Sequence, residues 1–316
     1  MNGIMTGTGT ETDPYIIEDV YDFCTITSSD TETYYELKNN IDFNNHDKWK
    51  NGFNEVFVVN APNAIINGNS KKIRNIVLHT LPYNNPVFYL NKIQNAFLEN
   101  VVLNNIDSER GESRNQGIFA CNFQLCSFSI DIINSQPCAI HSRNVYGISS
   151  MHKFEDCTFN IYGTTDSQSG INFHCMEMVR CHINFSDLIS NGSGYNNHNV
   201  GLLLSSDSTV YNSVYFTGSI KYNGNRKACI GLSHYGTFDN CYFAVNVSVG
   251  DDITKSIKHA TQFSPSISSL CFFVKDLIGD GTFNGSDFNM LINILDSQAK
   301  DISYLKSIGF PTIEVV

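Results

Sequence analysis

Residues 123–130 read FQLCSFSI, residues 154–161 read FEDCTFNI and residues 178–185 read MVRCHINF. In each stretch an apolar residue is followed by Cys at the fourth position and by apolar residues at the sixth and eighth. This alternation, with a period of two, predicts a strand with one buried face. Weaker copies recur about every 28 residues along the chain, which indicates a solenoid, and they begin at Ile73, Phe97, Val210, Phe238 and Ile267. In the copy that begins at Val210, the positions assigned to the core include Ser213 and Tyr215.

A glycine followed by an apolar residue precedes five of these units: Gly117, Gly147, Gly170, Gly201 and Gly231. Glycine tolerates a positive φ, so these positions suit a corner where the chain turns from one sheet to the next. Two short strands per turn, joined by loops of variable length, then make one coil. We therefore predict an all-β fold, a right-handed parallel β-helix. About eight coils at ~4.8 Å make a rod roughly 40 Å long. Antiparallel sandwiches also have short alternating strands, but they do not explain why a glycine precedes five of the units or why Cys recurs at the fourth position of the units.

The composition limits the possible partners. Only 16% of the residues are charged, so much of the polar surface must consist of Asn, Ser, Thr and Gly. The net charge is −11, without clusters of Lys and Arg, so nucleic acid is not an expected partner. Neither a secretory signal nor an apolar run of about 18 residues is present, so we expect no membrane insertion. Because the ten cysteines form no CxxC pairs, we expect them to be reduced fillers of the core.

The N-terminal region carries a motif. Residues 7–17 read GTGTETDPYII and residues 34–43 read YYELKNNIDF. This opening resembles the start of β-helical proteins of bacteriophage tails and tailspikes. Bacterial adhesin-like repeats share the same opening. Asn40 departs from the pattern, which has an acidic residue at that position. Residues 64–76, AIINGNSKKIRNI, resemble the first coils of such helices. The resemblance implies a cap over residues 1–50. The internal repeat predicts coils over residues 51–275, and the change of sequence character after them predicts a C-terminal cap over residues 276–316.

By the same resemblance, we expect a non-enzymatic structural or receptor-binding protein of a phage virion. Such a protein attaches to surface polysaccharide, contacts itself in a homotrimer and contacts other virion proteins, and it is made in the host cytoplasm. Two alternatives remain open on the same fold: a tailspike-type glycan hydrolase or lyase, and a bacterial cell-surface adhesin. The resemblance carries over no catalytic residue, no cofactor and no metal.

The C-terminal region changes character. Apolar residues recur at helical spacing over residues 287–295, which predicts a capping helix, and a second short helix is expected over residues 298–308. Residues 276–287 resemble the calcium-binding loop of dockerin or EF-hand proteins. Two positions depart from that loop, because Ile278 replaces an oxygen ligand and Asp287 replaces the final Glu. The alternative is an Asp/Gly turn before the helix. The residues that would bind calcium are Asp276, Asp280, Asn284 and Asp287.

Candidate catalytic residues are carboxylates, because glycan-cleaving β-helices use acids in a surface groove. The candidates are Asp156, Asp166, Asp187, Asp207 and Asp239, each with a solvated or turn-capping Asp as the alternative. Asp156 and Asp239 are three coils apart, about 14 Å, which exceeds the distance between the two catalytic carboxyl groups of glycosidases.

Three histidines show no triad or metal-ligand spacing, namely His141, His174 and His234. His182 is expected to point outward. The interval 187–199 is expected to form a large loop that contains Tyr195 and His198 and suits sugar binding.

Overall fold

The computed structural model is almost entirely β. It describes residues 5–52, 59–79, 86–104, 117–135, 139–141, 152–165, 171–173, 175, 177–190, 200–205, 210–222, 230–233, 237–239, 242–249, 259–261, 266–267, 271–273 and 291–293. The chain begins with β1 (Tyr15–Ile17), α1 (Val20–Cys24), β2 (Thr33–Leu37), β3 (Ile41–Asp42) and the 3-10 turn η1 (Phe43–Asn45). Long bent strands follow, namely β4 (Val59–Leu78), β5 (Phe88–Asn104), β6 (Gly117–Gln124) and β7 (Ser127–Ser135).

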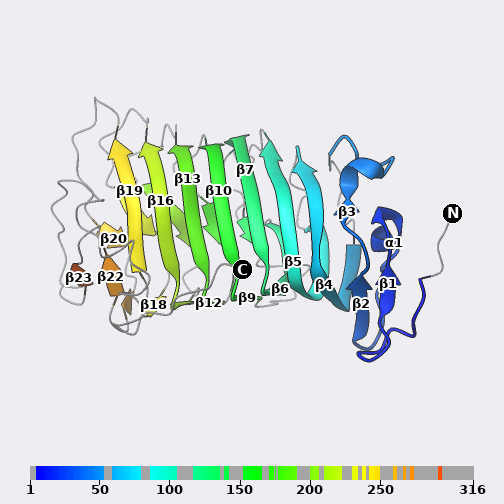
Figure 1. Ribbon diagram of the computed structural model, residues 1–316. Helices are drawn as coiled ribbons and strands as arrows, with labels where there is room; N and C mark the ends of the chain where they lie inside the picture. The colour runs from blue at the N-terminus through cyan, green and yellow to red at the C-terminus, as the bar shows by residue number, and fades with distance from the viewer. Residues whose placement is uncertain are drawn as a thin grey trace.

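From residue 139 onward each coil contains three strands, which stack in parallel on those of the next coil (Figure 1). The first ladder contains β8 (Ala139–His141), β11 (Ile171–Phe173), β14 (Val200–Ser205), β17 (Ile230–Ser233) and β20 (His259–Thr261). The second contains β9 (Lys153–Glu155), β12 (Glu177–Val179), β15 (Val210–Asn212), β18 (Thr237–Asp239) and β21 (Ser266–Ile267). The third continues from β7 through β10 (Thr158–Thr165), β13 (His182–Ser190), β16 (Tyr215–Tyr222), β19 (Tyr242–Val249) and β22 (Cys271–Phe273). The predicted parallel solenoid is confirmed, but the prediction of two strands per turn was wrong.

The pairing register corrects the repeat at one coil. Met178 pairs with Tyr211, and Ile183 pairs with Phe216. The core column therefore passes through Tyr211 and Phe216, one residue later than predicted from Val210. As a consequence, Tyr215 points outward rather than into the core, where it lies beside His182.

Two of the glycines that were predicted to form corners lie within strands. Gly201 and Gly231 are not corner residues, because they lie inside β14 and β17 and pair with each other. At a different corner, between the second and third ladders, one residue of each successive coil is left-handed: Asn95, Leu125, Asp156, Arg180 and Ser213, with φ between 49° and 57°. The backbone N–H of Leu125 donates to Glu155 O of the next coil at 3.0 Å, and the N–H of Asp156 donates to Val179 O at the same distance. These bonds between coils stabilise a conformation that is unfavourable for residues with a Cβ.

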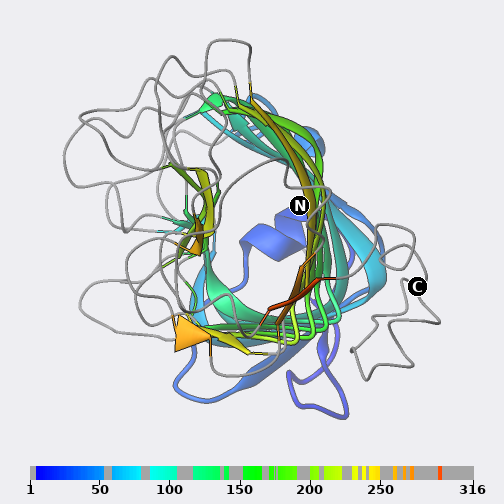
Figure 2. The same ribbon diagram turned by 90° about the vertical axis from the view of Figure 1, so that its left-hand side faces the viewer.

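The N-terminal end of the solenoid is covered by α1, which lies across the ring of strands in the end-on view (Figure 2). Asp19 caps this helix, since its carboxylate accepts hydrogen bonds from the N–H groups of Tyr21 and Asp22. Phe23 is fully buried, and its ring contacts those of Phe43 and Phe88 at 5.8 Å and 5.5 Å. The helix therefore buries apolar core that an open end would expose to water.

The opening motif forms a tight hook beside β1. Gly7 has a φ of 103°, and a Cβ there would lie 2.0 Å from Pro14 O. Ile16 N–H donates to Thr6 O at 2.8 Å, so the hook covers part of the outer edge of β1. The Tyr15 ring packs against that of Tyr35, with 5.6 Å between ring centroids. The glycines and the aromatic residue of the motif thus follow from close backbone packing.

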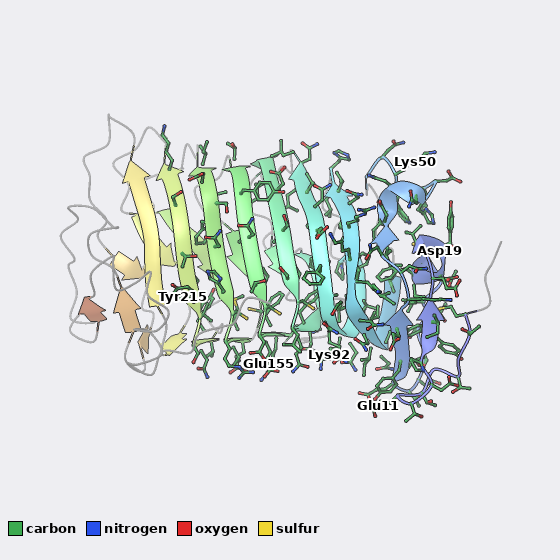
Figure 3. All side chains as sticks on the ribbon, viewed as in Figure 1. Glu11, Asp19, Lys50, Lys92, Glu155 and Tyr215 are labelled. Atoms are coloured by element: carbon green, nitrogen blue, oxygen red, sulfur yellow. The ribbon has the colours of Figure 1, made fainter. Side chains whose placement is uncertain are left out.

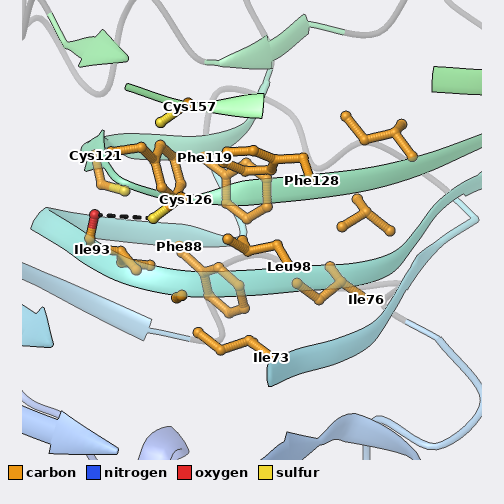
Figure 4. Close-up of a cluster of buried hydrophobic side chains, with 14 of the residues drawn as sticks. Ile73, Ile76, Phe88, Ile93, Leu98, Phe119, Cys121, Cys126, Phe128 and Cys157 are labelled. Atoms are coloured by element: carbon orange, nitrogen blue, oxygen red, sulfur yellow. Dashed lines mark hydrogen bonds between the residues drawn. The ribbon is translucent and has the colours of Figure 1, made fainter. Parts of the chain in front are cut away.

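Stacked aromatic rings and thiols fill the core (Figure 4). Phe123 and Phe154 stack at 5.3 Å with 3° between ring planes, and Phe128 and Phe159 stack at 4.6 Å. The column predicted from the repeat contains the buried, free cysteines Cys126, Cys157 and Cys181. Cys126 Sγ donates to Ile93 O at 3.5 Å. Burial raises the pKa of the Cys157 thiol well above its ordinary value, so the thiol stays protonated.

At the C-terminal end, the described residues correct the helix predicted over 287–295. Leu291–Asn293 form strand β23, which pairs in parallel with β22. The rest of that helix and the one predicted over 298–308 lie outside the described residues. Within the described part of the chain, no helix has the length and hydropathy needed to cross a membrane.

Candidate functional site

The structure separates the candidate acids. Asp156 occupies a corner, where Arg180 Nε donates to its carboxylate at 2.7 Å, so it serves in an ion pair. Asp187 was assigned to a loop, but it lies in strand β13, which extends through Ser190. Asp239 lies in β18. Asp166 and Asp207, the remainder of the predicted 187–199 loop, His174 and His234 lie outside the described residues, as do Asp276, Asp280, Asn284 and Asp287. His141 ends β8.

A broad polar surface covers the third ladder. We call the outward side chains of β7, β10, β13 and β16 the outer face; it is turned toward the viewer in Figure 3, where Tyr215 is labelled. The pairing register arranges these side chains in rows that cross the strands. The first row contains Ser127, Thr158, His182 and Tyr215, and the second contains Ser129, Asn160, Asn184 and Thr217. A third row contains Asp131, Tyr162 and Ser186.

Hydrogen bonds connect the second row to its neighbours. Thr217 Oγ1 donates to Asn184 Oδ1 at 3.0 Å, and Asn184 Nδ2 donates to Asn160 Oδ1 at 2.8 Å. Ser186 Oγ also donates to Asn160 Oδ1, at 2.6 Å. His182 Nε2 lies 2.8 Å from Thr217 Oγ1. We call these five residues the His182–Asn160 network; it spans three successive coils and fixes the rotamers of the side chains it includes.

The network determines the protonation of His182. The hydroxyl hydrogen of Thr217 is used in the bond to Asn184, so Thr217 must accept a hydrogen bond from His182. Nε2 therefore carries the ring hydrogen, and Nδ1 is unprotonated in the neutral ring. Burial lowers the pKa of His182 to about 4. At neutral pH the ring is uncharged, and it lies 4.9 Å from the ring of Tyr215.

Two carboxylates lie on the outer face. Asp131 precedes Tyr162 in the third row, and burial raises the pKa of its carboxyl group. Asp187 has a φ of 53° at a bulge of β13, and Ser219 Oγ donates to its carboxylate. Gly163 lies between the two strands that carry them, with a φ of 105°. A Cβ at Gly163 would lie 2.7 Å from Asp131 Oδ1 and 2.1 Å from Ile132 O, so only glycine fits.

The second ladder carries charged groups that neutralise each other. Lys92 Nζ donates to Gln124 Oε1, and Gln124 Nε2 donates to Glu155 Oε2. Arg180 binds Glu155 at 2.6 Å in addition to Asp156, and Lys153 pairs with Glu177. These contacts occur between side chains of neighbouring coils and hold the coils together. The surface offers no unpaired cluster of one charge among these residues.

Sequence reasoning missed most residues of the outer face. It expected His182 to point outward, which the structure confirms, but it assigned Tyr215 to the core and did not single out Tyr162 or Asn184. A signal was present, because the fifth and seventh positions of the repeat units are uncharged and polar. These positions are Ser127 and Ser129, Thr158 and Asn160, and His182 and Asn184.

The fold and its polar face define the chain as a parallel β-solenoid. No group of three potential metal ligands occurs among the residues with described positions. No model of a protein family matches the chain, and no curated protein matches it. A search of solved structures finds a "putative immunoglobulin A1 protease" from Bacteroides ovatus, with a TM-score of 0.43 and 16% identity over 84% of both chains. At this level of similarity, the match defines neither a family nor an activity.

Proposed function

We propose that the protein is a non-enzymatic solenoid that attaches to a glycan through the outer face. The observation that carries this proposal is the joined set of amides, hydroxyls and aromatic rings on β10, β13 and β16. Sugars are recognised by hydrogen bonds to their hydroxyl groups and by contact of their apolar ring faces with aromatic side chains. The His182–Asn160 network holds such groups in fixed positions, which lowers the entropy lost on binding.

The test is binding to immobilised polysaccharides extracted from bacterial envelopes. Tyr215→Ala removes an aromatic ring of the outer face, and Asn184→Ala breaks the network at its centre. We expect both variants to lose binding by roughly tenfold or more, equivalent to at least one lost contact. Tyr34→Ala is the matched control, because Tyr34 lies on β2 near the N-terminal end. Retained binding by both outer-face variants would contradict the proposal.

We place this attachment on a phage virion or tail, in a homotrimer whose chains are right-handed β-helices. The support is the resemblance of residues 7–43 to phage β-helical proteins, together with the right-handed crossover found in about 98% of parallel strand connections. Light scattering after gel filtration under reducing conditions tests the oligomer, with a mass of three chains expected. A monomer would contradict an autonomous spike and would favour a component that binds a partner platform, or the alternative of a bacterial adhesin.

A glycan hydrolase is the second candidate, favoured by Asp131 and Asp187. The two acids lie on β7 and β13, two strand spacings or about 10 Å apart along the axis. This axial separation is slightly above the roughly 6.5–9.5 Å between the carboxyl groups of inverting glycosidases, so the two side chains would have to lean toward each other. The raised pKa of Asp131, which suits a general acid, is the main support for this candidate. Release of reducing ends from a bound polysaccharide, abolished in Asp131→Asn and in Asp187→Asn, would establish this activity. Binding without release would leave attachment as the function.

A further inference from the structure

We infer that the ligand is an uncharged glycan whose chain lies parallel to the solenoid axis, with about one sugar for each coil. This inference rests on the proposed attachment function and specifies its ligand. It is carried by two features of the outer face, the scarcity of cations and the direction of its polar rows.

The charge of the outer face excludes an acidic ligand. Strands β7, β10, β13 and β16 contain one cationic residue, Lys221, near the end of β16. A uronate or sialate is normally bound by Arg or Lys through charge-assisted hydrogen bonds. The two carboxylates on this face, Asp131 and Asp187, would repel such a ligand instead. His182 is neutral above its pKa of about 4, so it adds no positive charge at neutral pH.

The rows of side chains determine the direction of the ligand. Along a strand, every second side chain points into the core, so outward residues are about 6.6 Å apart. Across the strands, residues of one row are only ~4.8 Å apart. The second row repeats amides and hydroxyls from coil to coil, in Ser129, Asn160, Asn184 and Thr217. A pyranose in an extended glycan advances by approximately one strand spacing. Successive sugars can therefore meet equivalent groups only when the chain lies along the rows.

The network leaves groups available to such a chain. Asn160 is exposed, and its Nδ2 donates to none of the described residues, although its Oδ1 accepts two hydrogen bonds. In the adjacent row, the rings of His182 and Tyr215 lie side by side on two successive coils. Amide donors in one row and apolar ring faces in the next match the polar edge and the apolar face of a sugar. The four strands span about 14 Å, the length of three to four sugars.

The inference is tested in two steps with the full chain. A glycan array first presents neutral dextran, mannan and galactan beside acidic alginate, hyaluronan and polysialic acid. Calorimetry then measures binding of oligosaccharides of two to six units, prepared from whichever neutral polymer is bound. We expect neutral polymers alone to bind, and the affinity to rise roughly tenfold from two to four units and then to level off. Tyr215→Ala and Asn184→Ala should lose this binding, whereas the controls Tyr34→Ala and Asn122→Ala should keep it.

The possible failures are distinguishable. Binding of acidic polymers that is lost in the outer-face variants would overturn the neutral ligand and leave attachment intact. An affinity that does not rise beyond two units would overturn the axial arrangement alone. If no polymer binds, or if the outer-face variants change the solution mass rather than glycan binding, both this inference and the attachment function fall.

Discussion

At the scale of single residues, the corners show how the solenoid tolerates unfavourable backbone conformations. Leu125 has a φ of 53° and is 60% exposed, so it combines a left-handed backbone with an apolar side chain in water. Its N–H is nevertheless bonded to the next coil, as are those of Asp156 and Arg180. The corner is thus maintained by the stacking of coils, which offsets the cost of a left-handed conformation at a residue with a Cβ.

Leu125→Asn should therefore stabilise the protein. Asparagine adopts the left-handed conformation at lower cost than leucine, and little buried apolar area is lost, so we expect a gain of about 0.5–1 kcal/mol. The midpoint of urea unfolding measures this change. Ile133→Asn is the control, since Ile133 is also exposed but lies in strand β7 outside the left-handed positions. An equal loss of stability in both variants would show that the corner carries no strain.

His182 gives a second prediction at this scale, the dependence of stability on pH. Its pKa is about 4 in the folded chain and about 6.5 in the unfolded chain, so the unfolded state binds more protons between these values. Stability should therefore rise as the pH increases from 4 to 6.5 and be complete above that range. The full difference in pKa corresponds to about 3.4 kcal/mol, and because His182 is partly exposed, solvent screening reduces the expected contribution to roughly 2–3 kcal/mol. Comparison of unfolding free energies with those of His182→Gln isolates this group from the carboxylates. The same pH slope in both proteins would contradict the assignment.

At the scale of elements, the sequence predicts the strands whose side chains alternate strictly. The Phe and Cys columns identify β7, β10 and β13, because buried faces require a period of two. Strands of three residues, such as β9 and β12, are too short to show a period, so two strands per turn were predicted where three exist. The helix predicted over 287–295 had the right spacing for an amphipathic helix, yet Leu291–Asn293 extend the ladder as β23. Pairing with β22 outweighs the local preference there.

The candidate site was less predictable than the strands. A shift of one residue in the register reverses the direction of every side chain, and this error placed Tyr215 in the core. The network also depends on which coils are adjacent, since Asn160 and Asn184 are 24 residues apart in sequence. Loops of different length separate the coils, so the sequence alone does not determine these contacts.

Packing within the column of stacked phenylalanine rings gives a third prediction. Phe154 is fully buried, stacks on Phe123 and meets Phe128 and Phe159 edge to face at 5.9 Å and 5.2 Å. Phe154→Ala should cost roughly 3–5 kcal/mol, because it leaves a cavity that rings above and below cannot fill. Phe154→Leu should cost less, as it keeps much of the volume. Chemical denaturation measures both changes. Equal losses would indicate that ring stacking, and not the filled volume, determines the stability of the column.

At the scale of the whole molecule, stability should be local, because each coil contacts only its neighbours. The outer face is built from β7, β10, β13 and β16, several coils away from α1, which covers the N-terminal end (Figures 1 and 2). Loss of the covering helix should therefore expose the first coils to water without altering the proposed binding surface. The buried core is continuous along the solenoid, but each coil packs only on its neighbours, so such damage should stay near the opened end.

Hydrogen exchange on Phe23→Ala tests this locality. The substitution removes the ring that contacts Phe43 and Phe88 and should cost roughly 3–5 kcal/mol at the N-terminal end. We expect faster exchange of the amides of β1, β2 and β4, because these strands lie next to the opened end, and unchanged exchange in β10, β13 and β16. Tyr21→Ala is the control, since Tyr21 lies on the same helix but is exposed. Uniformly faster exchange along the chain would mean that the solenoid unfolds as one cooperative unit, and the outer face would then depend on its distant end.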